Sequence, residues 1–219
     1  IYNMDFQEIL SSYKNKIYCY PWKFLAKMNI YNEKGSPIKF VTEDANWAIK
    51  SVGLNIKKEM DDISSNKIEV ITNPSRITKS VVHFGSQYMW LSWGQHMSKT
   101  NKFISTFFHG KPEDGIAIKK HIDQFLKSLP RLSKVITASS LIEKRLLSWD
   151  VNPQSITKIP LGVNTKIFLP AKKENKIAIR KLLKIPKDAI VIGSFQKDGI
   201  GWGNGIKPKL IKGPDIFVN

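Results

Sequence analysis

The sequence has a single cysteine, few arginines and no long apolar run. Cys19 has no second thiol with which to form an internal disulfide or a cysteine metal cluster, which fits a reducing compartment and predicts a cytoplasmic location. No apolar stretch approaches the roughly 20 residues that a membrane-spanning helix needs. The glycine-rich stretch near the C-terminus also lacks both the dinucleotide pattern GxGxxG and the Walker pattern GxxxxGK[ST].

Positive charge is the strongest bias of this 219-residue chain, whose formal net charge is +17. Nearly all of it comes from lysine, because arginine occurs only at Arg76, Arg131, Arg145 and Arg180. Such a field attracts nucleic acids, anionic membrane surfaces and nucleotide phosphates alike. Nucleic-acid recognition needs arginines and aromatic residues on one face, whereas these lysines are spread along the chain. A nucleic-acid partner is therefore not expected, although a basic nucleic-acid-binding module stays open as an alternative. Peripheral contact with an anionic membrane is a further expectation.

Short apolar runs alternate with amphipathic stretches between residues 37 and 168. The runs end at polar or glycine-containing loops, as buried strands do, and the stretches between them have helical spacing. Such alternation predicts an α/β fold with a Rossmann-like, doubly wound parallel sheet. The predicted strands are 38–41, 68–71, 80–84, 102–108, 134–137 and 155–160, and the predicted helices are 47–60, 116–129 and 139–149.

The residues that follow the predicted strands are candidates for a site, because ligands of doubly wound domains bind at the carboxyl ends of the strands. These residues are Asp44 and Asn46, Ser86 and Gln87, His109 and Gly110, and Ala138 and Ser139. The first such turn, EDANW at 43–47, has no glycine to cradle a pyrophosphate, which argues against a NAD site in this sheet. His83 is expected in the core. His96 and His121 lack the spacing of metal ligands, so no metal site is expected.

The two ends of the chain depart from this pattern. Residues 1–36 are expected to be an irregular linker or strap, with aromatic residues clustered around Pro21. A second α/β domain is expected to begin within residues 169–219, with a basic helix over 172–184 and a strand over 189–192. A glycine-rich loop, three lysines and a Gly-Pro-Asp helix start follow that strand. Backbone N–H groups and a helix N-terminus suit a phosphate group, and a surface loop with solvated lysines is an equal alternative.

Four segments between residues 133 and 218 match the motifs of one enzyme family in order and spacing. IPLGVNTKIFLP at 159–170 resembles the hinge motif P-x-G-V-[DN]-x-x-x-F-x-P, and SKVITAS at 133–139 resembles the strand motif A-D-x-V-I-x-x-S. RKLLKIPKD at 180–188 resembles R-x-x-L-G-I-P-x-D, and IGSF with KGPD at 192–215 resembles the donor-phosphate element G-R-L-x-x-x-K-G-x-D. The chain thus resembles the GT-B glycosyltransferases, in particular the retaining family 4 type. Residues 38–110 match that family only in strand order, and residues 1–36 do not match it.

The resemblance implies transfer of a sugar from a nucleotide-sugar donor to a glycan, lipid-linked or protein acceptor, with no metal or other cofactor. Residues 37–168 would form the acceptor-side N-terminal domain. Residues 169–219 would be the truncated start of the nucleotide-sugar-binding C-terminal domain, so this chain alone is expected to be inactive. A non-catalytic carbohydrate-binding relative stays open as an alternative.

The resemblance also implies a role for individual residues. His109 would face the donor sugar as the catalytic histidine. The diphosphate of the donor would be bound by Lys197, Lys209, Lys212 and Gly213, and the acceptor by Asn46, Trp47, Ser86 and Gln87. The arginine that is usual in the donor element is absent here, so lysine point charges would replace its bidentate fork. Trp90 and Trp93 are further candidates, as stacking faces for a sugar ring.

Overall fold

The computed structural model describes residues 3–32, 37–65 and 67–193, and it divides into two compact units. The first unit is Ile1–Leu161 and the second is Gly162–Asn219. The division lies inside segment 159–170, which resembles a hinge. The two units are treated separately below.

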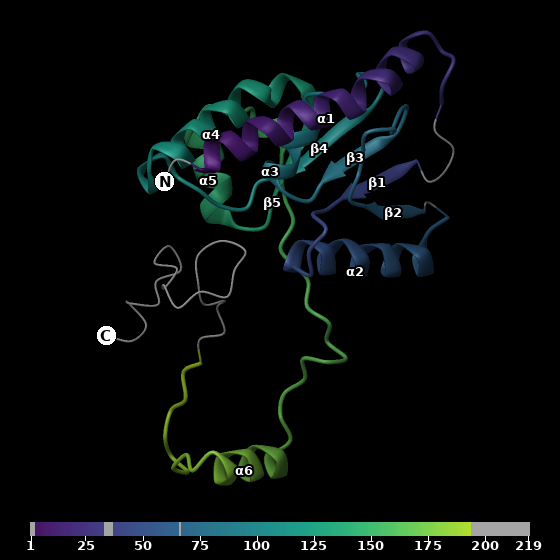
Figure 1. Cartoon of the computed structure of the whole chain (residues 1–219). Coiled ribbons are helices and arrows are strands. Elements are labelled where there is room, and N and C mark those ends of the chain that lie inside the picture. The colour runs from purple at the N-terminus through teal and green to yellow at the C-terminus, as the bar shows by residue number, and fades with distance from the viewer. Residues whose placement is uncertain (1–2, 33–36, 66, 194–219) are drawn as a thin grey trace. The chain divides into compact units, whose positions relative to one another are not determined.

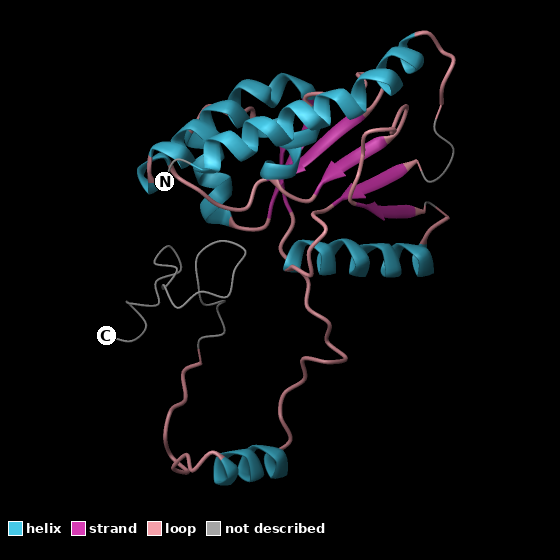
Figure 2. Cartoon of the chain, viewed as in Figure 1, coloured by secondary structure: helices cyan, strands magenta, loops and turns pink. Residues whose placement is uncertain are grey.

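The first unit is built on a six-stranded, all-parallel sheet with the strand order β2-β1-β3-β4-β5-β6 (Figures 1 and 2). The prediction of an α/β, Rossmann-like parallel sheet is therefore confirmed. All six predicted strands are present, and their ends differ from the prediction by no more than a few residues. The strands are β1 (Ile38–Val41), β2 (Ile68–Ile71), β3 (Val81–Phe84), β4 (Lys102–Thr106), β5 (Leu132–Thr137) and β6 (Ile156–Lys158).

Helical segments follow β1, β3, β4 and β5 and lead in each case to the next strand. They are α2 (Ala48–Ile63), α3 (Gln87–Met89), the π-helical turn η1 (Trp90–Gly94), α4 (Ile116–Ser128) and α5 (Ser140–Ser148), with short 3-10 turns at η2 (Pro112–Asp114), η3 (Leu129–Arg131) and η4 (Pro153–Ser155). Parallel crossovers are right-handed. Since α2 leads from β1 to β2 and α4 leads the opposite way along the sheet, from β4 to β5, the two helices cover opposite faces, as Figure 1 shows.

The strand order fixes the position of the switch point in this fold. From β1 the chain passes to β2 at one edge, and it then returns across β1 to β3 on the other side. The connections that leave β1 and β3 therefore diverge, and this switch point, at the carboxyl ends of the two strands, is where folds of this class bind their ligands.

The core lies between the sheet and the helical segments η1 and α4. Its centre is Trp90, which is fully buried and whose ring contacts the rings of Phe84 and Phe103. The indole Nε1 donates a hydrogen bond of 2.6 Å to Ser128 Oγ at the end of α4. This bond satisfies the polar atom of a buried tryptophan and joins η1 to α4.

Residues 1–36 are not irregular as predicted, because helix α1 (Asn3–Lys27) forms most of this segment and runs through Pro21. The helix packs on the rest of the first unit, and its residues Cys19 and Ala26 are buried in that contact. Asn15 Nδ2 donates to Ser92 Oγ over 2.8 Å, so the helix is fixed to η1. Proline and exposed aromatic residues suggested an irregular chain. The feature of the sequence that corresponds to the helix is the i, i+3, i+4 spacing of its buried positions.

The second unit contains α6 (Lys173–Leu182), which agrees with the predicted basic helix. The strand predicted over 189–192 is wrong, because this stretch is irregular and Ile190 is 90 % exposed. A parallel strand requires hydrogen bonds from a neighbouring strand, and no described residue pairs with these four. The guanidinium of Arg180 instead donates to the carbonyls of Pro186, Lys187 and Ala189 and so holds the turn after α6.

Candidate site at the carboxyl ends of β1, β3 and β4

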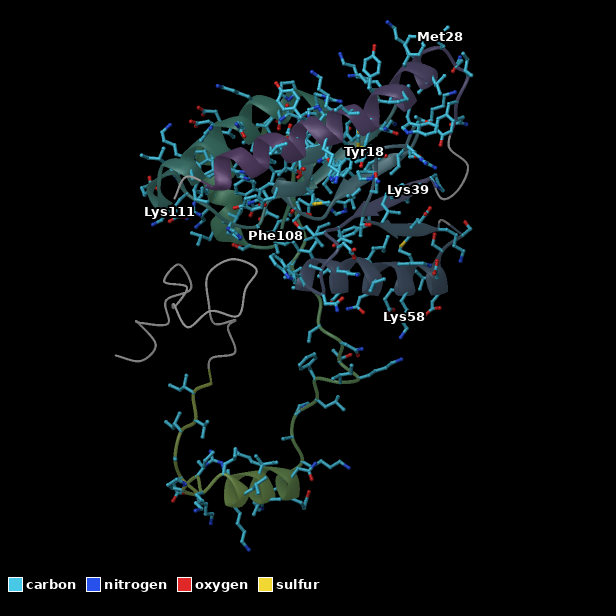
Figure 3. The ribbon with its side chains drawn as sticks, viewed as in Figure 1. Tyr18, Met28, Lys39, Lys58, Phe108 and Lys111 are labelled. Atoms are coloured by element: carbon cyan, nitrogen blue, oxygen red, sulfur yellow. The ribbon has the colours of Figure 1, made fainter. Side chains whose placement is uncertain are left out.

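Ser86, Gln87 and His109 lie together at the side of the sheet where its parallel strands end. This side, the carboxyl-end edge, is the edge meant below. Ser86 and Gln87 follow β3 directly, and His109 follows β4, the neighbouring strand. Phe108, just before His109, is labelled at this edge in Figure 3. The other two residues predicted on the acceptor side, Asn46 and Trp47, lie in the turn between β1 and α2 and are exposed. Ligands of doubly wound domains bind at the carboxyl ends of the strands, and we call this the strand-end rule. The rule correctly places the predicted residues of the first unit at the same edge.

Gln87 holds the backbone that carries His109. Its side chain is fully buried, and its Nε2 donates a 3.0 Å hydrogen bond to the carbonyl oxygen of His109. Its Oε1 accepts a 3.2 Å hydrogen bond from the backbone N–H of Phe108. Both ends of the amide are therefore used inside the protein, and we describe Gln87 as a positioning residue. Direct contact of Gln87 with an acceptor stays a prediction.

A second contact fixes the same loop from the side of α5. Arg145 Nη1 donates to the carbonyl oxygen of Gly110 over 2.9 Å. Gly110 has a φ of 116°, in the region that glycine adopts without strain, and this allows the chain to turn directly after His109. His109 is exposed while the residues on both sides of it are held by side chains, which suits a group that must meet a ligand in a fixed place.

Ser86 links β3 to the loop after β1. Its hydroxyl caps α3 by accepting from the N–H of Met89 and donates to Glu43 Oε1 over 3.2 Å. The other carboxylate oxygen of Glu43, Oε2, is buried and has no hydrogen-bond partner among the described residues. Burial raises the pKa of Glu43, and the bond from Ser86 opposes that rise. Sequence analysis missed Glu43, although it follows β1 by only two residues.

The side chains of Tyr88 and His121, which sequence analysis did not include in the site, lie beside His109. The ring of Tyr88 stacks on the imidazole of His121 from α4, with centroids 4.1 Å apart, and lies 6.2 Å from the ring of His109. Burial lowers the pKa of His121 to about 4, with a smaller contribution from His109, so the His121 imidazole is neutral at pH 7. In the part of the chain that the structure describes, no group of His, Cys, Asp and Glu side chains could hold a metal ion.

Trp90 does not offer the stacking face that was predicted for it, because its ring is fully buried in the core. Trp93 is half-buried and packs against the same core. The predicted donor-phosphate residues Lys197, Lys209, Lys212 and Gly213 lie outside the described residues.

No family model, curated protein or solved structure significantly matches this chain. What the structure shows is the fold class, a Rossmann-like α/β fold with a six-stranded, all-parallel sheet.

A hollow of about 300 Å³ lies away from this edge, beside α1, η1 and α4. Ser12, Gln95 and Gln124 are among the residues that line it, with His96, whose Nε2 is 3.0 Å from Ser12 Oγ. The residues that line this hollow come from α1, η1, α4 and their ends, and none comes from the turns that follow β1 and β4, so the site at the strand ends remains our candidate.

Two partly buried histidines, His83 and His121, predict how stability depends on pH. His83 lies between Phe40 and Thr106, and burial lowers its pKa to about 4, as for His121. Between pH 6.5 and 4 the unfolded chain therefore binds protons that the folded chain does not. As the pH is lowered through this range, the free energy of unfolding should therefore decrease, by at most about 1.4 kcal/mol per pH unit for each histidine.

Urea unfolding between pH 7 and pH 4.5 measures this dependence. The double variant His83→Asn, His121→Asn should have a clearly shallower pH dependence than the wild type. The raised pKa of Glu43 acts in the opposite direction in both proteins, since ionising its carboxyl group costs stability as pH rises. Equal slopes for the two proteins would contradict the burial that we assign to the histidines.

Proposed function

We propose that the chain is part of a glycosyltransferase that moves a sugar from a nucleotide-sugar donor to a glycan, lipid-linked or protein acceptor. The first unit would bind the acceptor and supply His109 to the reaction. The observation that carries the proposal is the edge of the sheet at which Gln87 fixes an exposed histidine beside the β1–β3 switch point.

The resemblance to the GT-B family supports the proposal at three places where motif and structure can be compared. Segment 133–139 covers most of β5 and includes Ser139, the N-cap of α5. Segment 159–170 contains the division between the two units. Segment 180–188 includes the end of α6 and the turn that Arg180 holds. In these three cases the motif falls on an element of the kind that the family has there, whereas the strand expected over 189–192, before segment IGSF, is irregular.

The proposed chemistry assigns different tasks to the two units. Departure of the nucleoside diphosphate leaves negative charge on its phosphates, which cations such as the predicted Lys197, Lys209 and Lys212 would stabilise. His109 would hydrogen-bond a hydroxyl of the donor sugar as positive charge develops at the reacting carbon. Because its backbone is held by Gln87, the histidine would need little reorganisation to reach that position.

Release of nucleoside diphosphate tests the proposal. The protein that contains this sequence is incubated with UDP-sugars and GDP-sugars and a mixture of membrane lipids and glycans, and free UDP or GDP is measured. We expect protein-dependent release with one class of donor. Sugar binding without release would instead favour a carbohydrate-binding relative. Binding of any DNA duplex at nanomolar concentration, with a steep salt dependence and no release, would favour a nucleic-acid-binding module.

A further inference from the structure

Helix α1 carries a stripe of large apolar side chains on the side that faces away from the domain. Its members are spaced three or four residues apart, so they share one side of the helix, and each is more than half exposed. They are Leu10 (53 %), Tyr13 (62 %), Ile17 (69 %), Tyr20 (67 %), Phe24 (52 %) and, just after the helix, Met28 (55 %). We call this set the outer stripe. Figure 3 labels Met28 at its end.

The inner side of α1 is less apolar than the outer stripe. Its buried residues are small or polar, namely Asn15, Cys19 and Ala26, while Ser12, Trp22 and Leu25 are half-buried. Ser12 and Asn15 form hydrogen bonds to His96 and Ser92, and the indole of Trp22 lies 4.9 Å from the guanidinium of Arg76. A helix that only covers its own domain buries its apolar side. Packing on the first unit therefore does not explain the outer stripe.

The charges along α1 indicate what the outer stripe meets. Lys16, Lys23 and Lys27 lie along one border of the stripe at helical spacing and Lys14 lies along the other, and all four are exposed. No acidic residue occurs between Leu10 and Met28. Two copies of the helix joined along their stripes would bring rows of lysines together, which disfavours a second copy of this chain as the partner.

We propose that the outer stripe docks on the surface of an anionic phospholipid bilayer. The apolar side chains would enter the boundary between headgroups and acyl chains, the tyrosine hydroxyls would remain at the level of the headgroups, and the lysines would contact lipid phosphates. Helix α1 would then lie in the plane of the membrane. None of the helices in the described residues is long and apolar enough to cross a membrane.

Flotation with lipid vesicles tests this surface. The chain is mixed with vesicles of phosphatidylcholine alone or with a quarter of phosphatidylglycerol, at low and high salt. The test variant is Tyr13→Ser, Ile17→Ser, Phe24→Ser. Its matched control, Leu54→Ser, Ile56→Ser, Ile63→Ser, removes three exposed apolar side chains from α2. A second pair replaces four lysines by glutamine, either Lys14, Lys16, Lys23 and Lys27 or Lys58, Lys99, Lys111 and Lys144. Thermal unfolding of every variant confirms that it is folded.

We expect the wild type to bind anionic vesicles, to bind neutral vesicles weakly, and to lose affinity at high salt. Partitioning should fall at least tenfold in the α1 serine variant and in the α1 lysine variant, and by less than twofold in both controls. Equal losses in test and control variants would overturn the proposal. So would an absence of binding to anionic vesicles, and a dimer, seen by light scattering, that the α1 serine variant dissociates would then assign the outer stripe to a second copy of the chain. No sugar nucleotide is used, so this result is independent of the proposed transferase activity.

Discussion

Replacing Gly94 by alanine should destabilise the first unit by about 3 kcal/mol or more, although the change adds a single methyl group. A Cβ atom at position 94 would lie 1.9 Å from Cε3 of Trp90, far inside van der Waals contact. The indole cannot move aside, because it is fully buried against the rings of Phe84 and Phe103 and bonded to Ser128. The glycine is therefore required by the close approach of the tryptophan ring.

Urea unfolding followed by tryptophan fluorescence measures the loss. Gly162→Ala is the matched control, since a Cβ there would meet no atom within 4 Å. A Gly94→Ala protein as stable as the control would contradict the packing of η1 on the core. The same glycine-to-alanine change is then made in a Trp90→Leu background. If it costs little stability there, the indole is the group that clashes with the added methyl group.

Replacing Gln87 by leucine should have the second large effect, on both stability and activity. Leucine fills similar space but leaves the carbonyl of His109 and the N–H of Phe108 without their partners. Each unpaired group costs roughly 1–3 kcal/mol when it stays buried, so we expect a loss of about 2–4 kcal/mol in the free energy of unfolding. A shift of His109 by about 1 Å would also lower the rate of the proposed sugar transfer by about a hundredfold.

Two controls separate these effects. Gln124→Leu on α4 makes the same chemical change at an exposed position and should alter neither stability nor rate by more than a small factor. Gln87→Glu keeps the acceptor for the Phe108 N–H but places a carboxylate oxygen against the His109 carbonyl, so it should also slow transfer. A Gln87→Leu protein that is less stable but turns over normally would remove the positioning role and leave only a structural one.

Much of the fold could be predicted because its signals are local. Strands 38–41 and 68–71 are short runs in which three of four residues are apolar, and they were predicted to the residue. Helix α1 was missed although its outer stripe has helical spacing, because Pro21 and the aromatic residues around it suggested an irregular segment. The strand at 189–192 was predicted from an apolar run alone, whereas a strand also depends on a neighbour that the run does not specify.

The site could be predicted only as far as the strand-end rule reaches. That rule placed Ser86, Gln87 and His109 at one edge of the sheet without any knowledge of their contacts. It could not show that Gln87 points inward to hold His109, because this depends on how α3 leaves β3. The contact between Tyr88 and His121 joins residues from two helices and has no counterpart in local spacing.

The most direct test of the proposed site compares two histidines in the assay for nucleoside diphosphate release. His109 lies at the strand-end edge, and His96 lines the hollow beside α1, away from it. We expect His109→Ala to lower the rate of release by about a hundredfold with little change in the free energy of unfolding, and His96→Ala to leave the rate within about threefold of the wild type. Equal rates in the His109→Ala variant and the wild type would contradict our assignment of this edge of the sheet as the catalytic site.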